Sequence, residues 1–187
     1  MDGGPTFRYG DMFQTAWNQP GTLFVVTTNS TINKRGELVM GRGSAKQLTL
    51  HARGVAKVFG EVLRQYHMDL YGLCVLTKDL LAEKLGHWCR IFCDIGAFQV
   101  KTRFSDRADT NLIRHSATLL LEYAVKHPNL TINMNMPGTG HGHLTEGAVM
   151  PYLKPLPKNV NIWRFEHEAP PQTAPIASDD NDELDQD

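Results

Sequence analysis

Residues 130–144 read LTINMNMPGTGHGHL, and this stretch decides the fold class of the chain. Its first part, Leu130–Met136, is a short apolar run of the kind that forms a buried strand, and it continues directly into a glycine-rich loop. In an open α/β sheet, ligands bind at the carboxyl ends of the strands, and glycine lets a ligand approach the backbone N–H groups closely. The stretch therefore predicts an α/β protein with a binding site where this strand ends.

A second stretch earlier in the chain has the same arrangement. Thr22–Thr28 predicts a buried strand, and the loop Met40-Gly41-Arg42-Gly43 precedes apolar residues at helical spacing from Ser44 to Tyr66. A helix N-terminus carries partial positive charge and unpaired donors, which favour phosphate, and Arg42 would add direct charge. Two such loops facing one cleft would suit a diphosphate held from both sides. Tight turns without a ligand are the alternative interpretation.

The rest of the chain alternates between strand and helix patterns, which predicts helices on both faces of one sheet. Further strands are expected at Tyr71–Thr77, Trp88–Cys93, Ile95–Thr102 and Val160–Phe165, and further helices at Asp106–Lys126 and Thr145–Leu153. Asp106, Asp109, Asn111 and Thr145 are of residue types that cap helices. Neither glycine-rich loop is a Walker A element, because no Gly-Lys-Ser/Thr follows, and neither is a dinucleotide fingerprint.

The composition predicts a soluble globular protein, with 41% hydrophobic and 21% charged residues among 187. No stretch approaches the roughly 18 consecutive apolar residues of a membrane span, so no membrane partner is expected. Three cysteines are too few for a disulfide scaffold, which favours a reducing, cytoplasmic setting.

The formal net charge of −1 conceals two regions of opposite charge. Residues 168–187 hold seven acids and no Lys or Arg, whereas residues 1–167 hold 13 acids against 19 bases, a net of +6. The C-terminal segment is rich in Pro and acid and cannot offset the entropy of ordering, so we expect a domain over 1–167 and a disordered acidic tail over 168–187. The tail is either a solubility segment or a polyanion that competes for the basic surface.

Several motifs, in order and spacing, resemble the macro domain, an ADP-ribose-binding module. They are Gly10-Asp11-Met12, Asn29 after the first apolar strand, MGRG at 40–43 and PGTGHG at 137–142. The segment FQVKTRFSDRADTNLIRHSATLLLEYA also resembles bacterial and phage members, and the loop MGRG is similar to the branch that contains terminal ADP-ribose glycohydrolases. The resemblance covers about residues 8–166. It implies a three-layer α/β/α sandwich with a central mixed sheet and an ADP-ribose cleft at its crest.

The resemblance also implies roles for individual residues. Asp11 would accept a hydrogen bond from the adenine amino group, Asn29 would lie by the distal ribose, and either Phe165 or Trp163 would pack on adenine. The expected ligand-binding residues are Asp11, Met12, Thr28, Asn29, Met40, Gly41, Arg42, Gly43, Pro137, Gly138, Thr139, Gly140, His141, Gly142, His143 and Phe165.

The residues that this branch uses for hydrolysis are replaced in the chain. Thr49 stands where the hydrolases have a lysine, and Leu144 stands where the glycohydrolase has an aspartate. Binding of ADP-ribose or a related ADP-ribosyl nucleotide, as a reader or a sponge, is therefore the first expectation. The alternatives are a hydrolase that removes ADP-ribose from protein or nucleic acid, an ADP-ribose-1″-phosphate phosphatase, and an interaction protein whose acidic tail docks to a basic partner.

Two residues are the candidates for catalysis. Lys46 lies one helical turn before Thr49, and His143 lies in the second loop, although a solvated lysine and a solvent-exposed histidine are the simpler interpretations. Cys89 and Cys93 with His87 lack a fourth zinc ligand, so no metal or cofactor is expected. Lys34, Arg35, Arg42 and Lys46 form a basic patch that makes nucleic acid a possible partner besides ADP-ribose or an ADP-ribosylated macromolecule.

Overall fold

One mixed six-stranded sheet forms the centre of the protein. The computed structural model describes residues 3–66, 69–86 and 90–164. The strands run in the order β1-β6-β5-β2-β4-β3, and every neighbouring pair is parallel except β3 and β4. The strands are β1 Thr6–Tyr9, β2 Thr22–Thr28, β3 Leu73–Leu76, β4 Asp94–Gln99, β5 Thr131–Asn135 and β6 Val160–Arg164.

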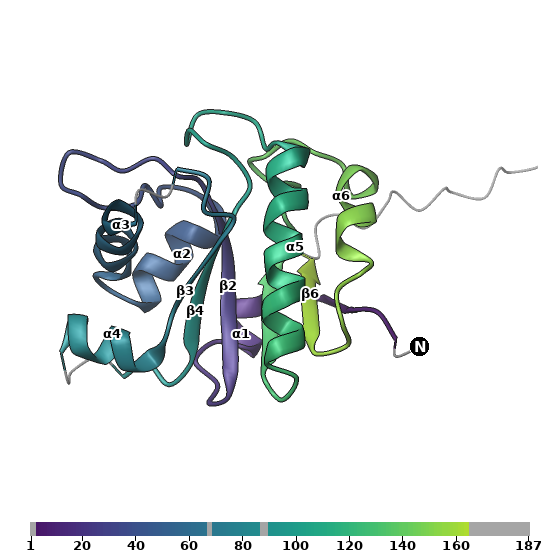
Figure 1. Ribbon diagram of the computed structural model, residues 1–187, viewed down its shortest axis with the longest axis horizontal. Helices are drawn as coiled ribbons and strands as arrows, with labels where there is room; N and C mark the ends of the chain where they lie inside the picture. The colour runs from purple at the N-terminus through teal and green to yellow at the C-terminus, as the bar shows by residue number, and fades with distance from the viewer. Residues whose placement is uncertain (1–2, 67–68, 87–89, 165–187) are drawn as a thin grey trace, which may run out of the picture.

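Helices cover both faces of this sheet, so the predicted three-layer α/β/α sandwich with a mixed sheet is confirmed (Figure 1). The helices α1 to α4 share one core with the sheet, and α5 and α6 share the other. They are α1 Met12–Thr15, α2 Gly43–His51, α3 Val55–Gln65, α4 Lys78–Leu85, α5 Thr110–Lys126 and α6 Glu146–Leu153.

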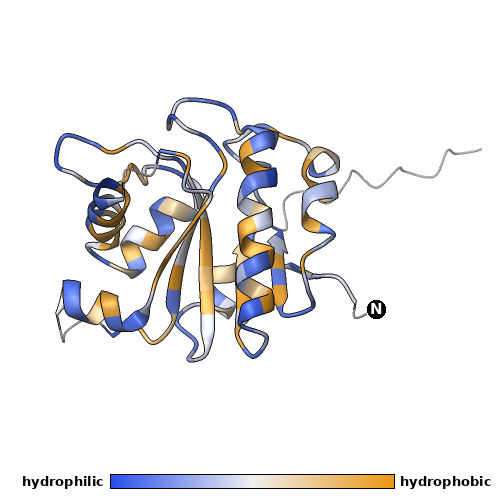
Figure 2. Ribbon diagram, in the orientation of Figure 1, coloured by the Kyte–Doolittle hydropathy of each residue, from blue (hydrophilic) through white to orange (hydrophobic). Residues whose placement is uncertain are grey.

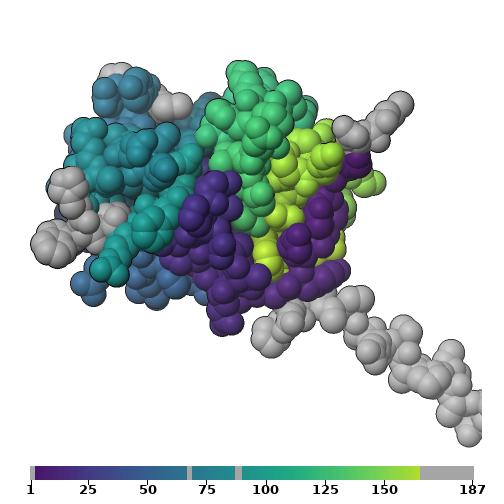
Figure 3. Space-filling model, turned by 90° about the horizontal axis from the view of Figure 1, so that it is seen from below, coloured from purple at the N-terminus to yellow at the C-terminus, as the bar shows by residue number. Residues whose placement is uncertain are grey.

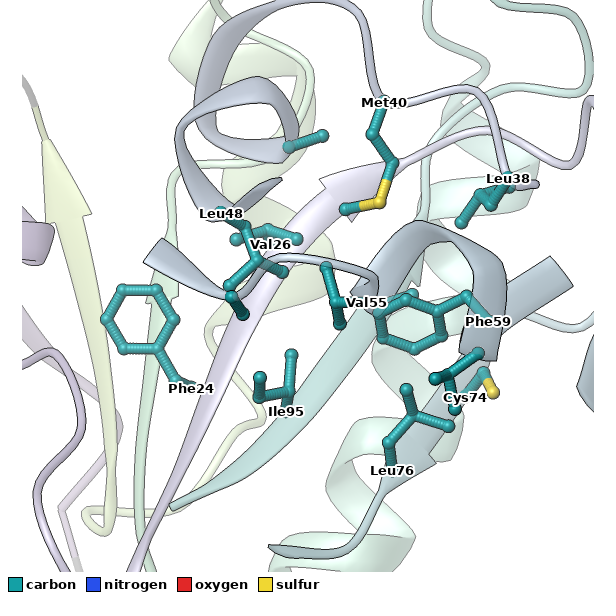
Figure 4. Close-up of a cluster of buried hydrophobic side chains, with 14 of the residues drawn as sticks. Phe24, Val26, Leu38, Met40, Leu48, Val55, Phe59, Cys74, Leu76 and Ile95 are labelled. Carbon is teal, nitrogen blue, oxygen red and sulfur yellow. The ribbon is translucent and has the colours of Figure 1, made fainter. Parts of the chain in front are cut away.

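Side chains that alternate along the central strand β2 build the two cores. Leu23 and Val25 belong to the cluster under α5 and α6, whereas Phe24 and Val26 belong to the cluster under α1 to α4. Figure 4 shows Phe24 and Val26 facing Leu48 of α2. Because strands buried on both faces are apolar throughout, β2 is orange over much of its length in Figure 2.

The glycine-rich loops and the other segments that follow β2, β4 and β5 lie together at the top of Figure 1. Figure 3 shows the opposite end of the molecule, where purple N-terminal residues lie between teal residues and yellow-green residues from the last part of the described chain. Within the described ranges, no helix has the length and apolar character that crossing a bilayer requires.

Several local predictions are confirmed. The first strand spans Thr22–Thr28 as predicted. Asp109 caps α5 by accepting a hydrogen bond from the backbone N of Asn111 at 2.7 Å, and Thr145 caps α6 by accepting one from the backbone N of Ala148. Asp106, also expected to cap a helix, instead closes a turn by accepting from the backbone N of Arg103, so the predicted helix at Asp106–Lys126 begins only at Thr110.

The prediction of one long helix from Ser44 to Tyr66 is wrong. The chain forms α2 and α3, separated at Ala52–Gly54, because Gly54 adopts a left-handed φ of 86° that a helix interior does not contain. The apolar spacing continues through the break because both helices pack on the same side of the sheet. Ala52, at the start of the break, is also non-helical, with φ of −127° and ψ of 79°.

The predicted strand at Trp88–Cys93 is also wrong over its described part, residues 90–93, which form a loop. The amide side chain of Asn18 forms hydrogen bonds with the backbone of this loop. It donates to the carbonyl of Arg90 at 2.7 Å and accepts from the N–H of Phe92 at 2.6 Å. The strand predicted at Ile95–Thr102 has different bounds in the structure, where β4 spans Asp94–Gln99. The elements β1, α1 and α4 were not predicted, and His87, Cys89, Phe165 and the tail at 168–187 lie outside the described residues.

Candidate functional site

A cavity of about 470 Å³ lies at the carboxyl ends of the four neighbouring strands β6, β5, β2 and β4. Its volume is within the range of about 300–1,000 Å³ that small-molecule sites occupy. The lining residues are Thr27, Thr28, Asn29, Val39, Gly41, Arg42, Gly43, Ser44, Ala45, Val100, Lys101, Phe104, Asn135, Met136, Gly138, Thr139, Gly140, His141, Gly142, Glu146, Trp163 and Arg164.

The two glycine-rich loops meet over this cavity. A Cβ built on Gly43 would lie 3.7 Å from Cδ2 of His141, so the loops face each other at contact distance. Gly43 and Gly138 have φ values of 56° and 76°, which residues other than glycine rarely adopt. A Cβ on Gly41 or Gly140 would meet nothing within 4 Å, so both backbones are open to a ligand.

The second loop is closely packed on its other side. A Cβ on Gly142 would lie 2.4 Å from the carbonyl oxygen of Gly138, and the carbonyl of Gly142 accepts a hydrogen bond from the N–H of Ala108 at 3.0 Å. The carbonyl of Gly138 also accepts from the N–H of Leu144 at 2.9 Å. The loop is therefore fixed against the segment that follows β4, and Gly142 leaves no room for a side chain whereas Gly140 does.

Asn135, at the end of β5, links this strand to β2 and to the first loop. Its Nδ2 donates to Oγ1 of Thr27 at 3.1 Å, and its Oδ1 accepts from Oγ of Ser44 at 2.9 Å and from the backbone N of Thr27 at 3.2 Å. Ser44 lies in the first turn of α2, so this side chain sets where that helix begins relative to the sheet.

Buried hydroxyl groups hold the end of β2. The phenol of Tyr71 donates to the carbonyl of Asn29 at 2.9 Å and forms a hydrogen bond with Oγ1 of Thr28. Burial raises the pKa of Tyr71 well above its usual range, so this group stays protonated. The amide of Asn29 donates to the carbonyl of Val39 and accepts from the N–H of Thr31, both at 2.8 Å, and thereby closes the base of the long loop after β2.

The charges of the cavity are distributed unevenly along it. At the β6 end, Glu146 and Arg164 form an ion pair at 2.7 Å. Toward β4, Arg42 and Lys101 line the cavity, and Nζ of Lys101 donates to the carbonyl of Asp106 at 3.0 Å. Burial, and then the positive charge of Arg42, hold the pKa of Lys101 below its usual value. The β6 end of the cavity therefore holds an ion pair, whereas the β4 end is basic.

Ten of the residues predicted from sequence line this cavity: Thr28, Asn29, Gly41, Arg42, Gly43, Gly138, Thr139, Gly140, His141 and Gly142. Trp163, one of the two aromatic candidates, lines it as well, and its Nε1 donates to Oδ1 of Asn133 at 3.1 Å.

The other predicted residues that the structure describes lie outside the lining. Asp11 caps α1 by accepting from the N–H of Phe13 at 2.8 Å, and Met12 is buried in the core. Lys46 is exposed on α2, and the carbonyl of His143 accepts a hydrogen bond from Arg107. Met40 and Pro137 flank the two loops, and Phe165 is not among the described residues.

Sequence reasoning missed Ser44, Lys101, Phe104, Asn135, Glu146 and Arg164, which all line the cavity. Lys101 and Asn135 lie at or just beyond the ends of β4 and β5, so the rule that locates ligands at carboxyl ends of strands could have found them. Phe104 could have been found only from the loop conformation, which leaves 52% of this aromatic residue exposed beside the cavity.

Searches against protein-family models and curated proteins gave no match. Among solved structures, the macrodomains of Thermus aquaticus DarG and Mycobacterium tuberculosis DarG are each 18% identical to the chain, with TM-scores of 0.63 and 0.64. The matches cover 88% and 86% of this chain and 99% and 97% of those chains.

A third similar structure is Thermosipho africanus DarTG in complex with ADP-ribose, at 19% identity and a TM-score of 0.65. This match covers 88% of the present chain but only 42% of the DarTG chain. Because the two whole-macrodomain matches extend from end to end of their partners, the similarity concerns one complete fold unit. The chain has the macrodomain fold.

Proposed function

We propose that the chain binds ADP-ribose, or a related ADP-ribosyl nucleotide, in the cavity between the two glycine-rich loops. The observation that carries the proposal is the meeting of these loops, at Gly43 and His141, over a cavity at the carboxyl ends of four strands. Open backbone at Gly41 and Gly140 leaves room for phosphate oxygens close to N–H donors. The solved structure of the similar DarTG contains ADP-ribose, which supports the same ligand class.

The length of the cavity suits a ligand that contains two nucleoside-like ends. From β6 to β4 the strand ends cover three spacings of about 4.8 Å, or about 14 Å in all. The diphosphate would lie between the glycine-rich loops, with the adenosine toward Trp163 and the distal ribose toward Asn29. Trp163 suits the adenine end because its hydrogen bond to Asn133 fixes the orientation of an aromatic face.

Calorimetric titration with ADP-ribose tests this proposal. We expect saturable one-site binding in the full chain and its loss in Gly140→Val, because the added side chain would project into the ligand space without meeting protein atoms. Gly147→Val, in α6 outside the lining, is the matched control and should bind normally. Absence of heat at millimolar ADP-ribose would contradict the proposal.

A hydrolase acting on ADP-ribosylated protein or nucleic acid is the second candidate, and the observation that favours it is the placement of His141 in the cavity lining. An imidazole there can take a proton from an attacking water. Incubation with ADP-ribosylated protein and DNA, followed by assay of free ADP-ribose, tests this reaction. Release of ADP-ribose that is lost in His141→Gln would support the hydrolase, while no release from the wild type would leave binding as the function.

A further inference from the structure

Exposed basic side chains lie beside the cavity on two of the segments that border it. Arg42 and Lys46 are one helical turn apart at the start of α2, and Arg103 and Arg107 belong to the segment between β4 and α5. We call these four residues the basic rim. All four are exposed, and within residues 3–66, 69–86 and 90–164 none of them forms an ion pair.

Contacts between the segments make the basic rim one continuous surface. The guanidinium of Arg107 donates to the carbonyl of His143 at 3.2 Å, which joins the segment after β4 to the second glycine-rich loop. The two glycine-rich loops meet at contact distance. Burial, and then the charge of Arg42, lower the pKa of Lys101, so the first loop also lies close to the segment after β4.

The segment after β4 contains one acidic residue, Asp106. Its charge acts on Lys101 and opposes the effect of Arg42, so Lys101 already has an anionic neighbour. The basic rim carries positive charge beyond this pair, because residues 41–46 and 101–107 together hold five bases and one acid, a net of +4. All described residues hold 19 bases and 11 acids, a net of +8, so half of this charge lies beside the cavity.

The opposite charge is concentrated near the C-terminus of the chain. Residues 179–187, DDNDELDQD, hold six acids in nine positions and no base. They lie outside the described residues, the last of which is Arg164. Because β4, β2, β5 and β6 are parallel, Arg164 lies at the same edge of the sheet as the basic rim, and it lines the cavity.

The length of chain between Arg164 and the acidic segment 179–187 suits the distance to the basic rim. A flexible linker of 14 residues, the length of 165–178, has a root-mean-square span of about 20 Å. The cavity extends about 14 Å from the end of β6 to the end of β4. Tethering over such a distance gives an effective concentration in the millimolar range, so ion pairs that are weak one by one can form a populated contact.

We propose that the acidic segment 179–187 docks on the basic rim of its own chain and there competes with an anionic ligand of the cavity. The docking does not depend on the identity of the ligand, whereas the competition rests on the proposed function. Arg42 belongs both to the basic rim and to the cavity lining, so a carboxylate of the segment and a phosphate of the ligand compete for its charge.

NMR spectra of the ligand-free full chain test the docking. The wild type is compared with an amide variant that keeps the length of the segment and removes its charge: Asp179→Asn, Asp180→Asn, Asp182→Asn, Glu183→Gln, Asp185→Asn and Asp187→Asn. At low salt we expect different backbone amide shifts at 41–46 and 101–107, and equal shifts when about 0.5 M salt screens the ion pairs. Differences confined to 165–187, or concentrated at the other end of the sheet, would overturn the docking.

Dilution distinguishes docking within one chain from docking between two copies. Shift differences at the basic rim that stay constant from about 50 μM to about 1 mM protein support the proposal, because an intramolecular contact does not depend on concentration. Differences that grow with concentration assign the contact to a second copy and overturn it.

Calorimetry with ADP-ribose tests the competition. We expect the amide variant to bind about three- to tenfold more tightly than the wild type at low salt, and equally at about 0.5 M salt. Lys46→Gln with Arg103→Gln removes two charges of the basic rim outside the cavity lining and should reduce this difference. Lys126→Gln with Lys158→Gln removes two exposed charges at the other end of the sheet and is the matched control, which should preserve the difference.

The outcomes separate the docking, the competition and the proposed function. Equal affinity of the wild type and the amide variant at low salt overturns the competition, and a difference that Lys46→Gln with Arg103→Gln leaves unchanged overturns the assignment to the basic rim. Absence of ADP-ribose binding in every variant overturns the proposed function, while the ligand-free spectra still decide the docking.

Discussion

Asn135 is the residue whose side chain connects the most parts of the candidate site. Its amide contacts β2 through Thr27 and α2 through Ser44. An amide can bond to both elements because it carries a hydrogen-bond donor and an acceptor on one planar group. The position of the first glycine-rich loop therefore depends on a polar residue at the end of β5, far away in the sequence.

Asn135→Leu tests this role. The substitution keeps the approximate size of the side chain but leaves the hydroxyls of Ser44 and Thr27 without this partner, which should cost about 1–3 kcal/mol of unfolding free energy. Urea denaturation measures the loss. Asn111→Leu, on the exposed surface of α5, is the control, and equal stability of the two variants would show that the bridge contributes nothing.

Two of the three glycines in the second loop, Gly140 and Gly142, should respond differently to alanine. In Gly142→Ala the new Cβ would lie 2.4 Å from the Gly138 carbonyl, so we expect a loss of at least about 2 kcal/mol, since backbone must move. In Gly140→Ala the Cβ meets nothing within 4 Å, and the change should stay within about 0.5 kcal/mol. Equal unfolding free energies by urea denaturation would contradict this packing.

At the residue scale, the sequence predicts the site where chemistry is concentrated in a short motif and fails where distant residues converge. The glycine-rich loops are recognisable because glycine occurs there at high density next to strand and helix patterns. Proximity to the first loop in sequence singles out Lys46 and gives no reason to consider Lys101. The structure leaves Lys46 exposed and brings Lys101 to the cavity, since β2 and β4 are neighbours in the sheet.

At the element scale, the start of α5 is defined by one side chain. Asp109 accepts a hydrogen bond from the N–H of Asn111, and the adjacent residue Ala108 donates its N–H to the carbonyl of Gly142. The cap thus fixes both the first turn of α5 and the segment that supports the second glycine-rich loop.

Replacement of this cap should weaken the helix and the loop together. We expect Asp109→Ala to lower the unfolding free energy by about 1 kcal/mol, because an N–H of the first turn loses its partner. Asp109→Asn retains a good cap and should preserve most of the stability. Thermal unfolding of both variants gives the comparison, and a wild-type melting temperature for the alanine variant would argue against the cap.

Elements are predictable from sequence where local pattern and tertiary environment agree. The centre of Thr22–Thr28 is the apolar run Leu23–Val26, because β2 is central and buried on both faces, and the predicted bounds of the strand agree with the structure. The apolar residues near Ile91 also predicted a strand. There, however, the backbone forms hydrogen bonds with the side chain of Asn18, and no strand forms. The break at Gly54 was missed because spacing reports the buried face of a helix and not the dihedrals between two helices.

At the scale of the whole molecule, two apolar cores on either side of one sheet hold titratable groups in neutral form. Burial raises the pKa of Cys74 to about 12 and that of Cys93 to about 11, from an ordinary value of 9.0. In the unfolded chain these thiols ionise near pH 9 while the folded protein retains their protons. The unfolding free energy should therefore be unaffected below pH 9 by these groups and should fall as the pH rises from 9 toward 12.

Urea denaturation between pH 8 and pH 11 measures this decline. Cys74→Ala removes one of the thiols, so its unfolding free energy should fall less steeply above pH 9 than that of the wild type, even if the variant is less stable at pH 8. Identical slopes for the two proteins would contradict the assignment to Cys74. Tyr71, whose pKa is also raised by burial, contributes in the same direction at higher pH and remains in both proteins.

The fold as a whole was predictable from sequence because strand–helix alternation and loops at strand ends both lead to an α/β sandwich. Only the resemblance implied that the sheet is mixed, and the antiparallel pairing of β3 with β4 was not predicted, since strand direction depends on the connection and not on composition. The charge distribution was predictable only in part. A net of +6 over residues 1–167 indicated a basic surface, but its concentration at the β4 end of the cavity follows from the order of the strands.

The binding of a diphosphate between the two glycine-rich loops is tested most directly by an NMR titration of the backbone amides with ADP-ribose. The predicted result is saturable shifts concentrated at Gly41–Gly43 and Gly138–Gly142, with smaller changes around Trp163 and Lys101 and none on the far end of the sheet. Saturable shifts that leave both loops unchanged, or no shifts at millimolar ligand, would contradict it.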